Sequence, residues 1–215
     1  MKRVFLTFAA ATVVFGAAEA SITGVVAQGN ILPTGPGVGY LPNFFSDTAL
    51  VIHGWNEAQN YTLTSGLAVD ITAPGGYGTA LTPGTIVAGT TISSHAFYFD
   101  PVATGGAQAT FAFDGTIIGV IVLDDDAGID KFVDSDYLIP ASVPVGNIPA
   151  GHFAARGLEL ASGDSLTVSG NHLSLSLNAN SPGDQVRVIT AAVPEPSTMA
   201  ALGIAAAIAT RRRRK

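Results

Sequence analysis

The chain of 215 residues contains no cysteine, and the part between its two ends contains almost no positive charge. Without cysteine the fold cannot be held by disulfides, so its stability has to come from a hydrophobic core. Between positions 21 and 193, fourteen acidic residues face only three basic ones, Lys131, Arg156 and Arg187, which leaves a formal charge of −11. Because binding to a phosphate backbone needs clustered lysine and arginine, this composition argues against nucleic acid as a partner.

The N-terminal segment has the three parts of an export signal. Two basic residues at positions 2 and 3 precede an uncharged apolar run from Val4 to Gly16, which is too short to span a bilayer. Small residues then stand at Ala18 and Ala20, the two positions that a signal peptidase reads. The pattern predicts a signal peptide over residues 1–20, removed by signal peptidase between Ala20 and Ser21.

The C-terminal segment consists of a proline-containing motif, a short apolar segment and a basic cluster. The motif is Pro194, Glu195 and Pro196, and the cluster is Arg211, Arg212, Arg213, Arg214 and Lys215. The 14 uncharged residues from Ser197 to Thr210 would form a helix about 21 Å long, against about 30 Å of hydrocarbon core. We expect a short transmembrane helix whose basic cluster stays on the cytoplasmic side, attracted by anionic headgroups. A simple tail anchor is the alternative.

This three-part tail resembles the PEP-CTERM protein-sorting signal of bacteria that secrete exopolysaccharide. The resemblance implies that residues 193–215 are a sorting signal, processed near Pro194 to Pro196 by a membrane-embedded sorting enzyme. The protein would then be exported, anchored transiently at the inner membrane, and passed to the cell surface or the extracellular matrix, where polysaccharide is a possible partner. The body also resembles secreted PEP-CTERM proteins of unassigned activity, over blocks such as Leu81 to Thr90 and Pro182 to Thr190.

Residues 21–192 show a periodicity of two, which is typical of β-strands. Asp164 to Val168 and Leu173 to Leu177 alternate apolar and polar residues on either side of a Ser-Gly-Asn turn, which predicts a hairpin. Phe97, Phe99, Phe111 and Phe113 are predicted to point inward from two strands, and Ile117 to Leu123 reads as a central strand covered on both faces. Further strands are expected at Leu50–Ile52, Tyr61–Leu63, Leu67–Ile71, Leu158–Leu160 and Gln185–Ile189. We predict an all-β fold, an antiparallel and jelly-roll-like β-sandwich, with a closed barrel as the competing solution.

An acidic loop is the one candidate metal site in the sequence. Asp124, Asp126 and Asp130 offer carboxylates at alternate positions after an apolar strand, a common way to present oxygen ligands to calcium. The EF-hand spacing fails, because Gly128 occupies the fifth position and Ser135 the twelfth. A solvated acidic loop that limits edge-to-edge strand pairing is the alternative.

Other candidate chemistry is sparse. The four histidines at positions 53, 95, 152 and 172 are scattered singly, and no nucleophile-elbow motif is present, so no catalytic residue and no cofactor is predicted. Trp55 and the tyrosines at positions 40, 61 and 77 lie near polar, glycine-containing segments, where they would either stack on sugars or fill the core, and we favour the core.

Three functions remain open from sequence. The first is a non-catalytic surface or matrix protein, the second a carbohydrate-binding or calcium-dependent adhesion module, and the third a secreted hydrolase with an unrecognised site.

Overall fold

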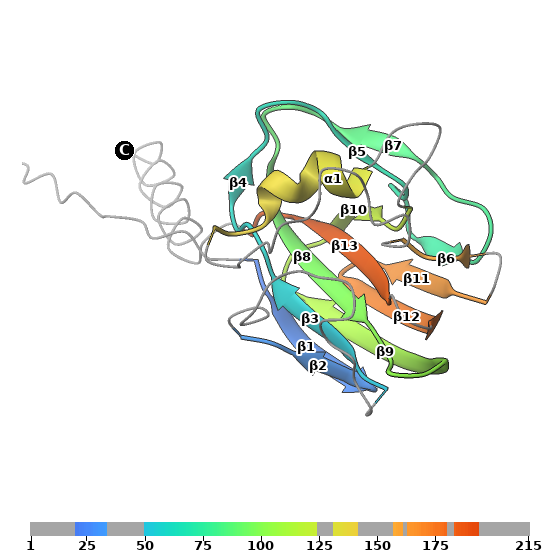
Figure 1. The fold of residues 1–215 in the computed structure, drawn as a ribbon. Coiled ribbons are helices and arrows are strands. Elements are labelled where there is room, and N and C mark those ends of the chain that lie inside the picture. The colour runs from blue at the N-terminus through green and yellow to red at the C-terminus, as the bar shows by residue number, and fades with distance from the viewer. Residues whose placement is uncertain are drawn as a thin grey trace, which may run out of the picture. The chain divides into compact units, whose positions relative to one another are not determined.

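The structure is a computed structural model that describes residues 20–33, 50–123, 131–141, 157–160, 163–179 and 183–193. All described elements belong to one unit, Glu19–Val193, and nearly all of them are strands (Figure 1). The predicted all-β fold is therefore confirmed. Among the described residues, no helix is long and apolar enough to cross a membrane. The predicted spanning segment, residues 197–210, lies outside them.

Two sheets form the layers of the sandwich. The five-stranded sheet has the order β1 (Ile22–Ala27), β9 (Gly105–Phe113), β12 (His172–Ala179), β11 (Ser165–Ser169), β6 (Gly75–Tyr77). The six-stranded sheet has the order β10 (Ile117–Ile121), β13 (Asp184–Ala191), β8 (Thr91–Phe99), β3 (Ile52–Asn56), β2 (Gly29–Ile31), and β4 (Tyr61–Thr62) also pairs with β8. All these pairings are antiparallel except that of β2 with β3. The chain passes between layers from β8 to β9 and again from β9 to β10, as expected for a jelly-roll-like sandwich.

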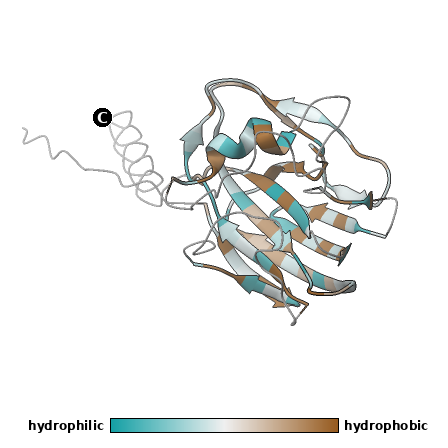
Figure 2. Cartoon of the chain, in the orientation of Figure 1, coloured by the Kyte–Doolittle hydropathy of each residue, from teal (hydrophilic) through white to brown (hydrophobic). Residues whose placement is uncertain are grey.

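The core between the two sheets is built from alternate residues of the long strands. Phe97 of β8 packs on Phe111 and Phe113 of β9, with ring centroids 4.5 Å and 6.0 Å apart. The predicted hairpin is confirmed, since β11 and β12 pair through a tight turn in which Gly170 has φ +61°, a left-handed conformation that glycine adopts without strain. Its inward residues Leu166, Val168, Leu173, Leu175 and Leu177 are all buried, as predicted. The bands of alternating hydropathy along the strands are visible in Figure 2.

A second apolar cluster covers the outer face of the six-stranded sheet. A short helix, α1 (Lys131–Ser135), a 3-10 turn, η1 (Asp136–Leu138), and a two-stranded sheet of β5 (Leu67–Val69) and β7 (Gly84–Ile86) form this cover (Figure 1). Phe132 of α1 and Ile189 of β13 belong to the same buried cluster. Because both faces of β13 are covered, all but the last of its residues are buried.

Several details differ from the sequence prediction. The strand predicted at the centre, β10, has both faces covered but lies at the end of its sheet order. Leu158–Leu160, predicted as a strand, is not one, because its apolar side chains pack on the core from an irregular segment. The short strands β1, β2, β6 and β7 were not predicted, since they are glycine-rich or have little alternation of polarity.

Candidate functional site

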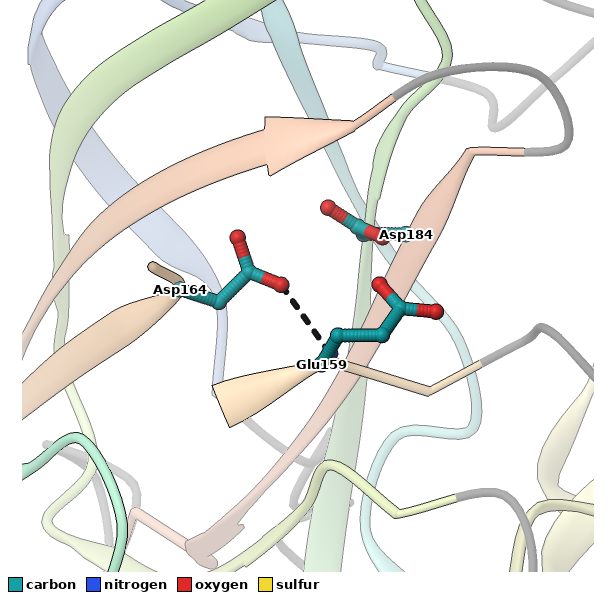
Figure 3. A group of neighbouring side chains, drawn as sticks. All are labelled: Glu159, Asp164 and Asp184. Carbon is teal, nitrogen blue, oxygen red and sulfur yellow. Dashed lines mark hydrogen bonds between the residues drawn. The ribbon is translucent and has the colours of Figure 1, made fainter. Parts of the chain in front are cut away.

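Three carboxylates from separate segments meet at one end of the sandwich. Glu159 lies in the irregular segment 157–160, Asp164 immediately precedes β11, and Asp184 is the first residue of β13. One oxygen from each carboxylate lies within 4.8 Å of the others, and Figure 3 shows the side chains converging. Asp164 and Asp184 are each 2% exposed, while Glu159 is exposed. We call these three residues the carboxylate cluster.

Backbone hydrogen bonds hold the cluster in place. Asp164 Oδ2 accepts the N–H of Glu159 at 3.0 Å, and its Oδ1 accepts the N–H of Asn178 in β12 at 2.8 Å. The neighbouring Gly183 is needed for close packing, because a Cβ there would collide with the carbonyl oxygen of Phe99. The cluster is therefore tied to three strands of both sheets.

Burial changes the acidity of two members of the cluster. The pKa of Asp184 is raised from its usual 3.8 to about 8, by burial first, then by the charges of Asp164 and Glu159 and a hydrogen bond with Glu159. Burial also raises the pKa of Asp164, against the two backbone hydrogen bonds, which lower it. Asp184 Oδ2 is buried and has no hydrogen-bond partner among the described residues. Burial therefore disfavours the charged forms of both Asp164 and Asp184.

The calcium candidates proposed from sequence, Asp124, Asp126 and Asp130, lie outside the described residues. The nearby Asp136 contacts the guanidinium of Arg187, and Asp134 is exposed on α1. Sequence reasoning missed the carboxylate cluster because its members are 5 and 20 residues apart along the chain. The one local signal is an acidic residue at, or directly before, the start of an apolar strand, as at Asp184 and Asp164.

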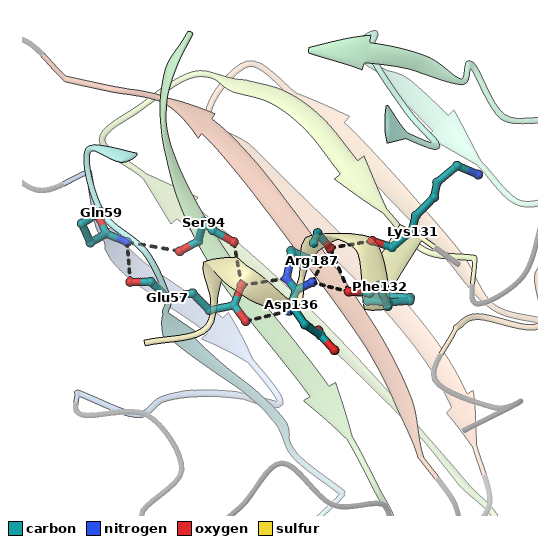
Figure 4. A network of polar contacts seen from close by, with 8 residues as sticks. Glu57, Gln59, Ser94, Lys131, Phe132, Asp136 and Arg187 are labelled. Carbon is teal, nitrogen blue, oxygen red and sulfur yellow. Dashed lines mark hydrogen bonds and ion pairs between the residues drawn. The ribbon is translucent and has the colours of Figure 1, made fainter. Parts of the chain in front are cut away.

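A buried network of charges lies beneath α1 (Figure 4). The guanidinium of Arg187 in β13 donates to Glu57 Oε2 at 2.8 Å and to Glu57 Oε1 at 3.0 Å. It also donates to the carbonyl of Phe132 at 3.1 Å, to Ser135 Oγ, and to Asp136 Oδ1 at 3.2 Å. Both side chains of the Arg187–Glu57 pair are fully buried, so this pair is closed to solvent, and the network anchors α1 on the sheet.

A second ion pair reinforces the same layer. Lys131 Nζ lies 2.6 Å from Asp70 Oδ1 with both side chains almost fully buried. Asp70 Oδ2 accepts the N–H groups of Val122 and Leu123 at 2.8 and 2.9 Å. This arrangement fixes the end of β10 against the covering layer.

The outer face of the five-stranded sheet carries a shallow polar hollow of about 390 Å³. Its polar lining is Gln108 and Thr110 of β9, Ser165 and Thr167 of β11, and Ser174 and Ser176 of β12. Thr110 and Ser174 share a hydrogen bond at 2.8 Å, and no charged residue is among the described residues that line the hollow. We call this surface the hydroxyl face.

The histidines and aromatics do not form a site in the described part of the chain. His95 is buried between Asn56 and Thr190, at 2.9 and 3.1 Å, and burial lowers its pKa from 6.5 to about 3. His172 is exposed at the start of β12, and position 152 lies outside the described residues. Trp55 is buried as predicted, but it lies with Ala96 in a small cluster of its own and does not fill the core between the two sheets. Tyr77 is buried, Tyr61 is half-buried, and position 40 lies outside the described residues.

The two residues flanking the predicted signal-peptide cleavage site are described. Ala20 is fully buried, and the backbone N–H of Ser21 donates to Asp114 Oδ1 at 2.7 Å. Pro194, Glu195 and Pro196, and the basic residues 211–215, lie outside the described residues.

Comparison with known protein families agrees with the sorting signal predicted from the sequence. The PEP-CTERM protein-sorting motif matches residues 192–215, which confirms the predicted resemblance. No curated protein and no solved structure is significantly similar to the chain. The chain carries a PEP-CTERM sorting signal at its C-terminal end and is thereby an exported protein, directed toward the cell surface by a membrane-embedded sorting system.

Proposed function

We propose that this chain is a non-catalytic protein of the cell surface or the extracellular matrix, whose β-sandwich is delivered by the sorting signal. One observation carries the proposal: the sorting motif begins at residue 192, directly after β13 ends at Ala191. Processing at residues 194–196 therefore removes none of the described strands, including β13, which lies between β10 and β8 inside the six-stranded sheet. The delivered unit is then the intact sandwich.

The tail supplies the membrane steps of this proposal. Its 14 uncharged residues and basic cluster retain the exported body at the inner membrane until the sorting enzyme acts near Pro194 to Pro196. The two prolines keep the chain extended around Glu195, which presents it to an enzyme in the membrane. Release then passes the body to the surface or the matrix.

The test replaces the motif in the cell that produces the protein. With Pro194, Glu195 and Pro196 all changed to alanine, we expect the unprocessed chain to accumulate with the inner membrane. The unaltered chain should release a body whose intact mass corresponds to a chain that ends near residue 194. Asp134→Asn, an exposed change on α1, is the matched control and should be processed normally. Equal processing and equal fractionation of the motif variant and the control would refute the proposal.

The hydroxyl face favours one further candidate function, binding of an uncharged polysaccharide. Its hydroxyl and amide groups are the kind that exchange hydrogen bonds with sugars, and the hollow concentrates six of them over three adjacent strands. An uncharged surface on a body with a formal charge of −11 suits a neutral polymer, because an acidic polymer would be repelled by the rest of the molecule.

Retention on the cell's own extracellular polysaccharide tests this second candidate. Removing both hydroxyls with Thr110→Val and Ser174→Ala should weaken retention about thirtyfold, since each good hydrogen bond is worth about 1 kcal/mol. Thr62→Val removes a hydroxyl from another exposed pair, with Thr91, and should leave retention unchanged. If no polysaccharide is retained, or if all variants are retained equally, the hydroxyl face is not a binding site.

The hydrolase alternative makes a different prediction. A hydrolase would release new reducing ends from the same polysaccharide, and Glu159→Gln would abolish that release, since paired carboxylates are the usual acid and base of glycoside cleavage. We expect no release from any variant. The carboxylate cluster contributes no residue to the lining of the hollow, although Asp164 directly precedes Ser165, which lines it.

A further inference from the structure

We propose that Glu159, Asp164 and Asp184 form a binding site for a divalent cation, with calcium as the best-suited ion. The site goes beyond the proposed function and does not depend on it. It is distinct from the acidic loop at positions 124–130, and it is assembled by the fold from the segment before β11 and the start of β13 (Figure 3).

The first argument is the state of Asp184. Its side chain is 2% exposed, and its Oδ2 atom is buried with no hydrogen-bond partner in the described part of the chain. Buried polar oxygens without a partner are rare, because each forfeits the hydrogen bonds it had in water. This oxygen belongs to a side chain that converges with two other carboxylates, and a cation is the partner that satisfies all three together.

The second argument is the balance of charge. Of the three basic residues of the body, Lys131 is paired with Asp70, and Arg187 with Glu57 and Asp136. The third, Arg156, lies outside the described residues. The two described cations are therefore engaged elsewhere, and a doubly charged ion would offset most of the charge of the cluster.

The third argument is the fit of the ligands. All three ligands are carboxylate oxygens, which are hard donors preferred by calcium and magnesium over softer metals. Oxygens within 4.8 Å of one another allow a central ion to lie about 2.8 Å or less from each, a range that includes the roughly 2.3–2.6 Å of calcium. Calcium also tolerates irregular sets of oxygen ligands, whereas magnesium demands near-ideal octahedral geometry. A small closing movement completes the contact, and water reaches the remaining coordination positions past the exposed Glu159.

The number of ligands sets the expected affinity. A site with three carboxylates and several waters matches extracellular calcium modules, with a dissociation constant of about 0.1–1 mM. The sorting signal sends this chain to the outside, where such an affinity is useful. Calcium would there join β13 to the segment that leads into β11, and so clamp the two sheets at one end.

The test measures thermal unfolding and calorimetric binding with the full chain and CaCl₂. At a calcium concentration tenfold above the dissociation constant, we expect the melting temperature to rise by about 3–6 °C. Sodium chloride at matched ionic strength should give no such rise. Glu159→Gln, an exposed change, should weaken calcium binding at least tenfold. Asp184→Asn should weaken binding as much, and the folded variant needs no ion to balance a buried charge at this position.

Two controls make the result decisive. Asp134→Asn removes one exposed carboxylate of α1 and should bind calcium as the unaltered chain does. Replacing Asp124, Asp126 and Asp130 together by asparagine should also leave binding unchanged. The proposal is overturned if the unaltered chain binds no calcium, which would assign the charge balance to a proton or to Arg156. It is equally overturned if the acidic-loop variant alone loses binding, or if Glu159→Gln and Asp184→Asn bind as well as the control.

Discussion

Removing the partner of Arg187 is predicted to be the most damaging conservative change in the sandwich. Glu57→Gln keeps the shape of the side chain but removes the fully buried carboxylate that accepts two hydrogen bonds from the guanidinium of Arg187, and leaves only the partly exposed Asp136 as its charged partner. Breaking a buried ion pair from one side costs about 3–5 kcal/mol. Because domains of this kind have about 5–15 kcal/mol of stability, the change removes a large share of it. At about 2–4 °C per kcal/mol, the melting temperature should fall by roughly 10 °C.

Urea unfolding of the purified chain, followed by circular dichroism, provides the assay. The matched control is Asp136→Asn, because Asp136 contacts the same guanidinium once, at 3.2 Å, from a side chain that is 20% exposed. The control should cost less than about 1 kcal/mol. Replacing both members of the pair, with Glu57→Leu and Arg187→Met, should cost less than Glu57→Gln alone, since no charge is then left buried. A cost below about 1 kcal/mol for Glu57→Gln would show that the guanidinium finds another partner and that the network does not anchor α1.

Three further predictions concern protonation and processing. Because the pKa of His95 falls to about 3 on folding, the unfolded chain takes up a proton at a higher pH than the folded chain, so the free energy of unfolding should drop by about 2 kcal/mol from pH 7 to pH 5. In urea titrations His95→Gln should lose this pH dependence, and an unchanged pH dependence would exclude a buried neutral imidazole. The pKa of Asp184 moves the other way, to about 8, so in calcium-free buffer the stability that this group contributes is present in full below pH 4 and is lost as the pH rises through 8. The loss between pH 6 and pH 8 should be about 2 kcal/mol. Urea titrations of Asp184→Asn should show no such loss, and a loss equal to that of the unaltered chain would contradict the assignment. If cleavage leaves Ser21 as the first residue, its new ammonium group lies beside Asp114 Oδ1. Asp114→Asn should then lower the stability of the processed chain by at most about 1 kcal/mol, and should lower the stability of the uncleaved chain by less. Equal losses of the two chains in thermal unfolding would refute the ion pair.

The pattern of alternating residues was enough to predict the core of this fold. Each long strand with strict alternation was predicted within a few residues, and its inward side chains are those found buried, as for Leu173, Leu175 and Leu177 of β12. The prediction succeeds there because a shift of one residue would turn every leucine to solvent. For β10 the prediction that both faces are covered is confirmed, but the predicted central position is wrong. An unbroken apolar run shows that both faces are covered but not how many neighbouring strands there are.

The buried polar groups were beyond sequence reasoning for a different reason. Arg187 lies inside a predicted strand, between Val186 and Val188, and a charge at such a position needs a buried partner. Its partner Glu57 is 130 residues away and is brought near only by the pairing of β3 and β13 with β8. The carboxylate cluster has the same origin, since it depends on two strands that begin at the same end of opposite sheets. Local patterns can show that a charge needs a partner, but the topology decides which one it meets.

The positions of the first and last strands connect this fold to its export. Ala20 is fully buried and β1 begins at Ile22, only two residues beyond the predicted signal-peptide cleavage site. A peptidase needs an accessible, extended chain, so cleavage there has to precede the pairing of β1 with β9. The sorting motif stands in the opposite relation to the fold, because it begins after β13 is complete, and its processing can follow folding. If the signal peptide is removed where the sequence predicts, that cleavage therefore has to come before the sandwich closes, whereas the sorting motif can be processed after the domain has folded.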